Sequence, residues 1–252
     1  MLLKVLATGS KGNCYILDSE KGYSAILDAG IPFRQIMQGI NYSSNMVDFV
    51  LITHEHMDHF KAVPDLLKVG ISVFASRGTM NAHGSRCKEC RHNETIDLRS
   101  ALSPGVGKWI IHPFAVEHDC KEPLGFLIGN TSTGHKILYA TDTKHIKYRF
   151  NNLTHIIIEC NYNADILLNN IAAGKVPNSM KKRLMNSHMS LDSCLKFLKS
   201  IDLSSCRKIV LIHLSDGNSN ARVMVDEITK ATGIETIAAE NNMIIDFNLY
   251  EF

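Results

Sequence analysis

Short apolar runs recur along the chain, and they predict two sets of strands. Each run is bounded by Gly, Ser, Asn or Asp, which is typical of buried strands that end in turns. The first set comprises Leu2–Leu6, Cys14–Leu17, Ala25–Leu27, Phe49–Ile52 and Ile71–Phe74. The second set comprises Trp109–Val116, Leu124–Ile128, Lys136–Ala140, His155–Ile158 and Ile209–Ile212.

Helical patterns lie between these runs. One covers "IPFRQIMQGI", where Pro32 suits a first turn, and another covers "HFKAVPDLLKVG", which ends on a glycine placed like a C-cap. Two later helices are expected near Leu191–Ser200 and Ser219–Lys230. Each half of the chain thus contains strands followed by helices, which predicts an α/β protein.

Two segments have a less regular pattern. Ser76–Lys108 is of mixed polar composition, and we expect a helix followed by an excursion over the surface. Asn161–Ser187 contains Gly, Pro and Asn together with the basic stretch "MKKRL". We expect it to form a lid or arm near a site, because long irregular connections in compact domains usually serve function.

Composition and length indicate a globular protein. With 252 residues, 45% hydrophobic and 21% charged, we expect one domain, residues 1–252, rather than a disordered or membrane protein. No apolar run approaches the roughly 20 residues of a spanning helix. The start "MLLKVLATGS" resembles a first strand more than a signal peptide, so we expect a cytoplasmic protein.

Charge and cysteine content narrow the function only slightly. A formal net charge of +2 gives no strong footprint for binding long nucleic acids, although it does not exclude them. Seven cysteines, an odd number, fit reduced thiols better than a disulfide framework.

The segment "THEHMDH" concentrates chemistry directly after a predicted strand. His54 and His56 point the same way if the strand continues for two more residues, and Asp58 and His59 then lie on the turn that opens the next helix. Imidazoles and a carboxylate are the ligands that zinc prefers in catalytic sites. One short segment cannot complete a metal shell, so further ligands are required from other strand ends.

Further ligand types follow three other predicted strands. His118 lies in "EHD", Asp142 in "TDT" and His213 in "HLSDGNS". Each residue alone would be read as a surface histidine or a helix-capping aspartate. Together with the histidine-rich segment they predict a metal centre built from several strand ends.

These motifs resemble those of the metallo-β-lactamase-fold hydrolases. The resemblance rests on "ILDAG" with Asp28, on "THEHMDH", and on the order of the three later ligands, and it spans nearly the whole chain. It implies a four-layer αββα sandwich of two mixed β-sheets flanked by helices.

The resemblance also implies two zinc ions per chain, with manganese as an alternative. One ion would be bound by His54, His56 and His118. The other would be bound by Asp58, His59 and His213, with Asp142 bridging the two ions. Two metals at such a site activate water and stabilise the attacking and leaving oxygens at phosphorus.

Roles for the remaining polar residues follow from the same resemblance. Asp28 would order the loop that bears the ligands. Asp58 is also the expected general base. Glu55 is expected to face solvent or to support a ligand rather than to take part in catalysis.

Two later segments, "IIIECNYNADIL" and "NSHMSLDSCLKFL", resemble the small cytoplasmic phosphodiesterase branch of these hydrolases. In this interpretation His188 donates a proton to the leaving oxygen and Glu159 fixes its tautomer. The alternative is that His188 is a loop residue beside the helix cap Ser190.

For the substrate, "GSKGN" together with "ILDAG" resembles two groups. One is the bacterial exonucleases that degrade DNA from the 5′ end; the other is the phage-encoded cyclic-nucleotide phosphodiesterases, which would act in a host cytoplasm. The low net charge and the lack of a long basic arm favour a small, cyclic nucleotide, with 5′-to-3′ cleavage of single-stranded DNA as the alternative. Ser215 and Asn218 are candidate substrate contacts, and a homodimer is expected by resemblance.

Two other classes of function could use the same ligand residues. Acyl chemistry, as in a lactonase, thioesterase or β-lactamase, would use the same metals but has less need of a His–Glu pair. A non-enzymatic metal-binding or scaffold protein would not need the full ligand set.

The motif "CKEC" contains Cys87 and Cys90, near His83 and His92. The two cysteines either hold a structural zinc or are a reduced pair, and the lack of a second CxxC favours the reduced pair.

Overall fold

The computed structural model describes residues 1–19, 24–98 and 109–249, and the chain forms two compact units. Within the described residues, the first unit comprises Met1–Ala115, Cys120–Lys136 and the chain from Glu240 onward. The second comprises Val116–Asp119 and Ile137–Ala239.

The first unit contains a seven-stranded mixed sheet with the strand order β14-β1-β2-β3-β4-β5-β6. Its strands are β1 Leu2–Ala7, β2 Cys14–Asp18, β3 Ser24–Leu27, β4 Val47–Leu51, β5 Val73–Ala75, β6 Lys88–Glu89 and β14 Met243–Asp246. The pairs from β14 to β3 are antiparallel, and those from β3 to β6 are parallel. The carboxyl ends of β3, β4 and β5 therefore point the same way.

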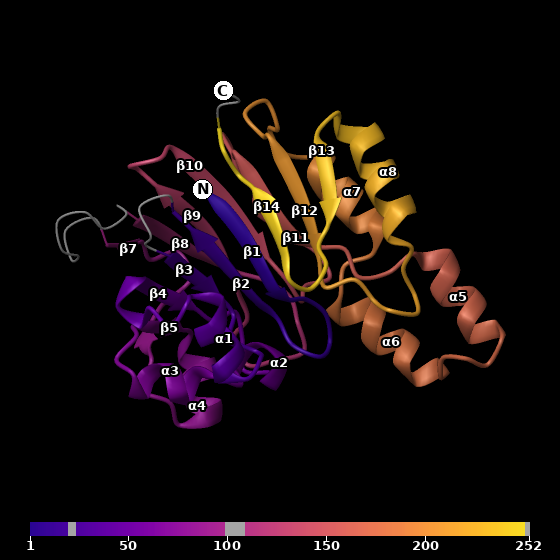
Figure 1. Cartoon of the computed structure of the whole chain (residues 1–252). Helices are drawn as coiled ribbons and strands as arrows, with labels where there is room; N and C mark the ends of the chain where they lie inside the picture. The colour runs from indigo at the N-terminus through magenta and orange to yellow at the C-terminus, as the bar shows by residue number, and fades with distance from the viewer. Residues whose placement is uncertain (20–23, 99–108, 250–252) are drawn as a thin grey trace. The chain divides into compact units, whose positions relative to one another are not determined.

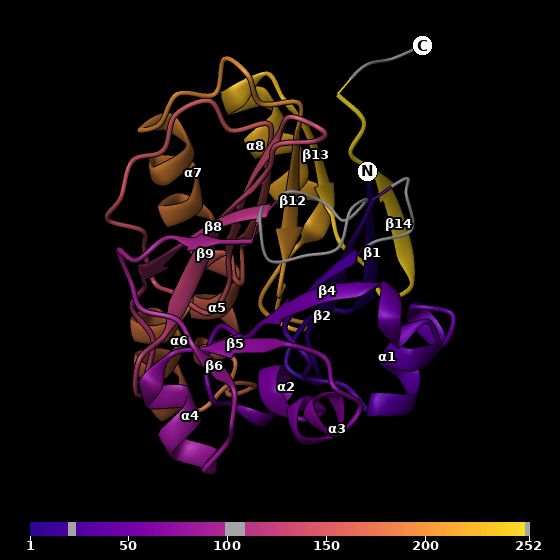
Figure 2. The ribbon, with the colours of Figure 1, turned by 90° about the vertical axis from the view of Figure 1, so that its left-hand side faces the viewer.

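Short helices cover one face of this sheet. They are α1 Phe33–Gly39, the 3-10 turn η1 Ser44–Met46, α2 Met57–Phe60, α3 Val63–Lys68 and α4 Arg77–His83. Ile36 of α1 and Leu66 of α3 are buried in one cluster with Ile16, Ile26 and Val50 of the sheet. Figures 1 and 2 show α1, α2 and α3 gathered beside these strands. This apolar layer holds the β4–α2 connection in place.

The second sheet also has seven strands, in the order β13-β12-β11-β10-β9-β8-β7. Its strands are β7 Ile96–Asp97, β8 Trp109–Ala115, β9 Leu124–Asn130, β10 His135–Ala140, β11 His155–Glu159, β12 Lys208–Ile212 and β13 Glu235–Ala238. The pairs β7–β8 and β8–β9 are antiparallel, whereas β10 to β13 run parallel. Every residue of β11 is buried, as expected for a central parallel strand.

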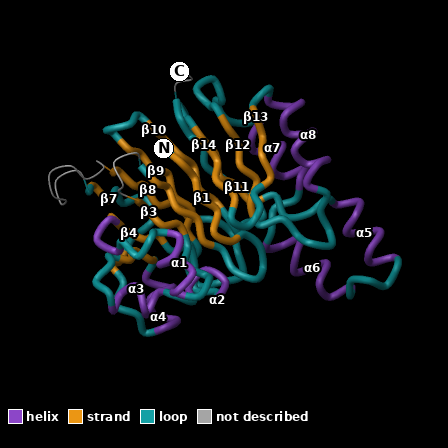
Figure 3. The backbone as a smooth tube through the Cα atoms, viewed as in Figure 1, coloured by secondary structure: helices purple, strands orange, loops and turns teal. Residues whose placement is uncertain are grey.

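Four helices belong to the second unit. They are α5 Ala164–Ala172, α6 Asn178–Ser187, α7 Leu191–Lys199 and α8 Ala221–Thr232. The buried side chains of α7 and α8 include Phe197, Leu198, Met224 and Ile228, and α8 contacts β13. Figure 3, in which helices are purple and strands orange, shows α5 and α6 as a helical hairpin beyond the strands of this unit.

All ten predicted strands are present, with bounds that differ by a few residues. Four short strands, β6, β7, β13 and β14, were not predicted. The "HFKAVPDLLKVG" helix is divided into α2 and α3, with Pro64 in the first turn of α3, and Pro32 is the N-cap of α1 rather than a first-turn residue. Because α2 and α3 are separate helices, the direction of the α2 residues is set by the preceding loop and not by the axis of α3.

The two segments of irregular pattern also contain regular structure. In Ser76–Lys108 the structure has α4, β6 and β7, and residues 99–108 lie outside the described part of the chain. Asn161–Ser187 forms α5 and α6 rather than an irregular loop. Within residues 1–19, 24–98 and 109–249, no helix is long and apolar enough to cross a membrane.

Candidate metal centre

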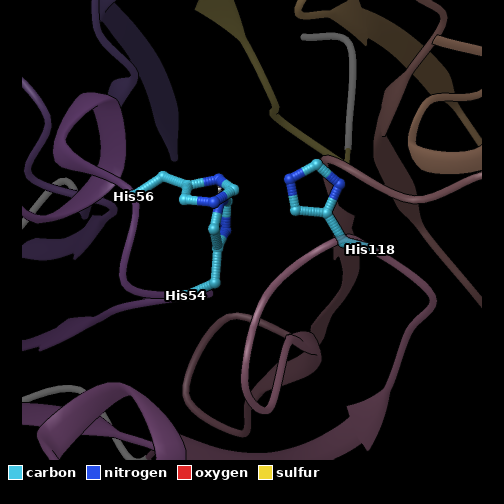
Figure 4. Close-up of side chains that lie close together, drawn as sticks. All are labelled: His54, His56 and His118. Carbon is cyan, nitrogen blue, oxygen red and sulfur yellow. Dashed lines mark hydrogen bonds between the residues drawn. The ribbon is translucent and has the colours of Figure 1, made fainter. Parts of the chain in front are cut away.

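In the first unit, the loop between β4 and α2 brings two histidine rings together. β4 ends at Leu51, so the strand does not continue to His54 as the sequence interpretation supposed, and His56 is instead the N-cap of α2. His54 Nε2 nevertheless lies 3.0 Å from His56 Nδ1. Figure 4 shows these two rings, together with His118 of the second unit. Two nitrogens bound to one tetrahedral zinc at about 2.0–2.1 Å lie about 3.3 Å apart, so this spacing suits a shared metal.

Asp28 orders the ligand loop through both carboxylate oxygens. Its Oδ1 accepts hydrogen bonds from the backbone N–H of Thr53 at 2.8 Å and from the Thr53 hydroxyl at 2.9 Å. Its Oδ2 lies 2.8 Å from Nδ1 of the fully buried His59. A carboxylate can only accept, so His59 carries its proton on Nδ1 and presents the lone pair of Nε2 as a ligand. Asp58, also on α2, lies 3.5 Å from that Nε2.

A contact that sequence reasoning missed comes from the β1–β2 turn "GSKGN". The buried Asn13 side chain accepts from the backbone N–H of Gly9 at 2.9 Å, and its Nδ2 lies 3.1 Å from His59 Nε2. Its backbone N–H donates to the carbonyl of Asp58 at 2.8 Å. In the sequence analysis this motif served only as part of a resemblance that bears on the substrate. The fold uses its glycine and asparagine to support α2.

Gly30 of "ILDAG" is required by close packing against the same loop. A Cβ atom at this position would lie 1.6 Å from the carbonyl oxygen of Asp58. The backbone N–H of Gly30 also donates to the carbonyl of Asn13 at 2.9 Å. The motif therefore contributes the carboxylate of Asp28 and the space that the α2 backbone occupies.

Glu55 supports the loop from its other side. Its Oε1 accepts from the backbone N–H of Lys121 at 2.7 Å, and its carbonyl accepts from His83 Nε2 at 2.7 Å. The His83 ring stacks on Phe60 with 4.1 Å between ring centroids. These contacts agree with a supporting role for Glu55, and they occupy Nε2 and one ring face of His83.

Cys87 and Cys90 are buried free thiols. Burial raises the pKa of Cys87 and raises that of Cys90 to about 12, so both side chains are protonated at neutral pH. Neither cysteine belongs to a group of metal-ligand atoms in the described residues. The lack of further ligand atoms around them in the described residues favours the reduced pair.

In the second unit, His118 follows β8 and is held by α6. Its Nδ1–H donates to the backbone carbonyl of Ser187 at 2.8 Å, which directs Nε2 toward Asp142 Oδ2 at 3.6 Å. Burial lowers the pKa of His118 and therefore favours the neutral ring, the form that binds a metal.

Glu159 joins two histidines at the end of β11. Its Oε1 lies 2.6 Å from His188 Nδ1 and 3.2 Å from His213 Nδ1, while Oε2 accepts from the backbone N–H groups of Thr143 and Met189 at 2.9 and 3.1 Å. Burial opposes ionisation of Glu159, but the charge and hydrogen bond of His188 outweigh it, so its pKa lies below the usual range. Burial alone would lower the pKa of His188; attraction to Glu159 exceeds this effect and raises it. The pair therefore favours carboxylate and imidazolium.

The loop that contains His188 also has the helix cap that the alternative interpretation of His188 expected. Ser190 is the N-cap of α7, and its hydroxyl accepts from the backbone N–H of Ser193 at 3.1 Å. The cap fixes the loop, and the bond to Glu159 fixes the ring. The two interpretations of His188 are thus compatible.

Three polar residues at strand ends have left-handed backbone angles. Asp28 after β3 has φ 57°, Asp142 after β10 has φ 43°, and His213 after β12 has φ 56°. Such angles cost non-glycine residues on the order of 1–3 kcal/mol each and cluster at functional sites. In the second unit they bring His213 Nε2 to 3.7 Å from Asp142 Oδ1. Asp142, Glu159, His188 and His213 offer ligand-type atoms that lie within 4.8 Å of one another.

Ser215 and Asn218 form the loop that follows His213. The Asn218 side chain donates to the Ser215 hydroxyl at 3.3 Å and accepts from Asn170 of α5 at 3.0 Å. The backbone N–H of Ser215 donates to the carbonyl of Asn161 at 2.8 Å. Both side chains thus have a structural role, and a direct contact with substrate stays a prediction.

The donor atoms fit metal ions. Each unit contains buried imidazoles whose far ring nitrogen is fixed by a carboxylate, hydroxyl or backbone carbonyl, which leaves the other nitrogen as a ligand. Each unit also contains an aspartate beside those nitrogens. Mixed nitrogen and carboxylate ligands of this type suit zinc and neighbouring divalent metals.

Comparison with known proteins places the chain in a family. Residues 25–214 match the sequence profile of the beta-lactamase superfamily domain. The chain belongs to this superfamily. The chain is similar to exodeoxyribonuclease YycJ of Bacillus anthracis, with 27% identity over 91% of this chain and 89% of the relative. It is also similar to exodeoxyribonuclease WalJ of Streptococcus pneumoniae, with 26% identity over 98% of this chain and 92% of the relative.

A solved structure shows the same fold. The metallo-β-lactamase-fold protein YhfI of Bacillus subtilis aligns over 97% of this chain and 98% of its own, with a TM-score of 0.72 and 15% identity. With the two seven-stranded mixed sheets flanked by helices, this confirms the predicted fold. The predicted hydrolase class is confirmed by the superfamily and its relatives.

Asp28 offers a direct test of how the ligand loop is ordered. In the Asp28→Asn variant the oxygen can still accept from Thr53, but the amide that replaces Oδ2 cannot accept from His59 Nδ1–H. We expect zinc affinity, measured by competition with a chromogenic chelator, to fall about 10–100-fold. Asp65→Asn, a half-exposed site on α3 of the same unit, is the matched control. Wild-type zinc affinity in Asp28→Asn would contradict this role.

Proposed function

We propose that this protein is a two-zinc exodeoxyribonuclease that hydrolyses phosphodiester bonds of single-stranded DNA. The observation that carries the proposal is similarity to proteins named exodeoxyribonucleases over 91% and 98% of the chain. The donor set supports it, because both units contain oriented imidazoles next to aspartates. Cleavage in the 5′-to-3′ direction is part of the proposal.

The proposed metal ligands are those of the sequence prediction. One zinc would be held by His54, His56 and His118. The other would be held by Asp58, His59 and His213, with Asp142 shared. When bound, the two ions would activate water and offset negative charge at the phosphodiester oxygens. Manganese fits the same donor types.

The chain's own residues supply proton transfer. Asp58, on the first turn of α2, is proposed to accept a proton from the attacking water. His188 is proposed to give a proton to the leaving 3′ oxygen, and its raised pKa supports this role because the ring stays charged to higher pH. Glu159 holds the His188 ring through Nδ1, which leaves Nε2 as the donor atom.

The relatives reverse the order of substrates that the sequence favoured. Low net charge pointed to a cyclic nucleotide, whereas the full-length similarity to exodeoxyribonucleases favours DNA. Cyclic-nucleotide hydrolysis stays a prediction of second rank. Acyl chemistry gains no support from these relatives.

A parallel assay decides among these substrates. Purified protein with zinc or manganese is incubated with 5′-phosphorylated single-stranded DNA, cyclic mononucleotides and a thioester. We expect progressive release of mononucleotides from DNA with a preference of about 10⁴-fold over cyclic nucleotides, on the scale of discrimination by sites that bind polar groups specifically. Hydrolysis of cyclic nucleotides with DNA left intact would replace the proposal by its alternative.

Three further properties stay predictions. We expect residues 1–252 to act as a single domain, the protein to be cytoplasmic, and two chains to form a homodimer. Light scattering of the purified protein checks the last of these, with a mass of twice the 28.1 kDa chain expected.

A further inference from the structure

The α5–α6 hairpin has a strong local charge that the metal centre does not explain. From Ile166 to Ser190 the chain has four basic residues and no acidic residue. Lys175 lies in the connection between the helices and is exposed; the other three, Lys181, Lys182 and Arg183, lie on α6. The whole chain has a net charge of only +2, so this segment concentrates positive charge.

One face of α6 combines this charge with apolar and amide groups. Lys182, Met185 and Asn186 are exposed and spaced at i, i+3 and i+4, which places them on the same side of a helix. Met185 is 49% exposed and places an apolar group beside Lys182. Cations that follow the phosphate backbone are common to proteins that bind single-stranded nucleic acid, and Lys182 supplies one; Met185 adds apolar surface for a sugar or base, without the stacking of an aromatic ring.

The C-terminal end of α6 is part of the metal-ligand framework of its unit. The carbonyl of Ser187 holds His118 Nδ1–H, and His188, the next residue, is bound to Glu159. One turn earlier, Arg183 Nε lies 3.3 Å from Asp119 Oδ2. From His188 to Lys182 the helix rises about 9 Å. This rise is on the order of the length of two to three nucleotides in a stacked strand.

The hairpin is anchored where it starts. The backbone N–H of Asn163 donates to the carbonyl of Asn218 at 2.9 Å, and the Asn170 side chain donates to the carbonyl of Gly217 at 2.8 Å. Both partners lie in the loop that follows His213. Figure 1 shows α5 and α6 extending from this end of the unit. These contacts tie α5 to the loop that follows His213, while the Ser187 carbonyl ties the end of α6 to His118.

We propose that α6 is the surface that binds the phosphodiester backbone of single-stranded DNA next to the reacting bond, with Lys182 and Lys181 contacting phosphates. This inference rests on the proposed function and names how that site holds a polymer. It explains how a chain with little net charge could retain DNA: the charge is placed on one helix whose end holds a metal ligand. A cyclic mononucleotide has no neighbouring phosphates and gains nothing from this helix.

The test measures binding without cleavage. The metal-loaded protein is titrated with a fluorescent, phosphorothioate-linked single-stranded oligonucleotide at several salt concentrations. We expect the double variant Lys181→Gln/Lys182→Gln to raise Kd about 10-fold and to lower the slope of log Kd against log salt by about 1.4, since each lost phosphate contact removes about 0.7. Lys196→Gln/Lys199→Gln, which removes two exposed charges from α7 of the same unit, is the matched control and should keep both values.

The outcomes separate this inference from the proposed function. Equal Kd and salt slope in the α6 variant and the wild type would overturn it, as would equal losses in the α7 control. Failure of the wild type to bind the oligonucleotide would also overturn it and leave α6 to a partner of another class. If the α6 variant weakens binding but unmodified DNA is never cut, the surface is supported and the proposed activity fails.

Discussion

Replacing Asp58 with alanine is expected to lower kcat/KM for hydrolysis of 5′-phosphorylated single-stranded DNA by about 10³-fold, within the range for loss of a general base. Zinc content, measured by mass spectrometry, is expected to fall from two ions per chain to one. The reason is the double role proposed for this carboxylate, which lies 3.5 Å from the ligand nitrogen of His59.

A second substitution separates the two roles of Asp58. Asp58→Asn keeps an oxygen donor but cannot accept a proton as readily, so it should retain more zinc than Asp58→Ala with a similar loss of rate. Asp65→Ala, on α3 of the same unit, should match the wild type in both measurements. A fully active Asp58→Ala variant with two zinc ions would show that another group is the base and the ligand.

Replacing His188 with alanine is expected to lower kcat for DNA by about 10²–10⁴-fold, the usual contribution of a positioned general acid. With bis(p-nitrophenyl) phosphate, whose leaving group departs without a proton, the loss should be below about 10-fold. The difference between the two substrates is the signature of a proton donor. It follows from the Glu159–His188 contact of 2.6 Å and from the raised pKa of His188.

The matched control for His188 is His145→Ala, because His145 is a partly exposed histidine of the same unit that contacts Glu117. It should leave the rates with both substrates unchanged. An equal loss with DNA and with bis(p-nitrophenyl) phosphate in His188→Ala would indicate that His188 maintains the α6–α7 loop and does not donate the proton.

The ligand positions could be predicted because they follow a local rule. Asp142 and His213 come directly after strongly apolar strands, and the carboxyl ends of β10 and β12 lie on the same side of a parallel arrangement. Polar residues in such places can be recognised from the sequence alone, because each one ends an apolar run. The same holds for "THEHMDH", although the strand before it ends earlier than expected and the two rings meet through the α2 N-cap.

Other features could not be predicted because they depend on distant partners. Asn13 contacts His59 across 46 positions, and nothing in "GSKGN" distinguishes a supporting turn from an ordinary hairpin. β14 pairs with β1 near the opposite end of the chain, and its four residues carry too little pattern to stand out. In Asn161–Ser187 the Gly and Pro residues lie in the turn between α5 and α6, so breakers that suggested an irregular segment mark the connection of a helical hairpin.

The central claim, hydrolysis of DNA by two metal ions, is tested most directly by titrating zinc into metal-free protein while following digestion of 5′-phosphorylated single-stranded DNA. We expect no digestion before zinc is added, and a rate that rises and saturates near two ions per chain. Full digestion by the metal-free protein, or saturation without any release of nucleotides, would contradict the account.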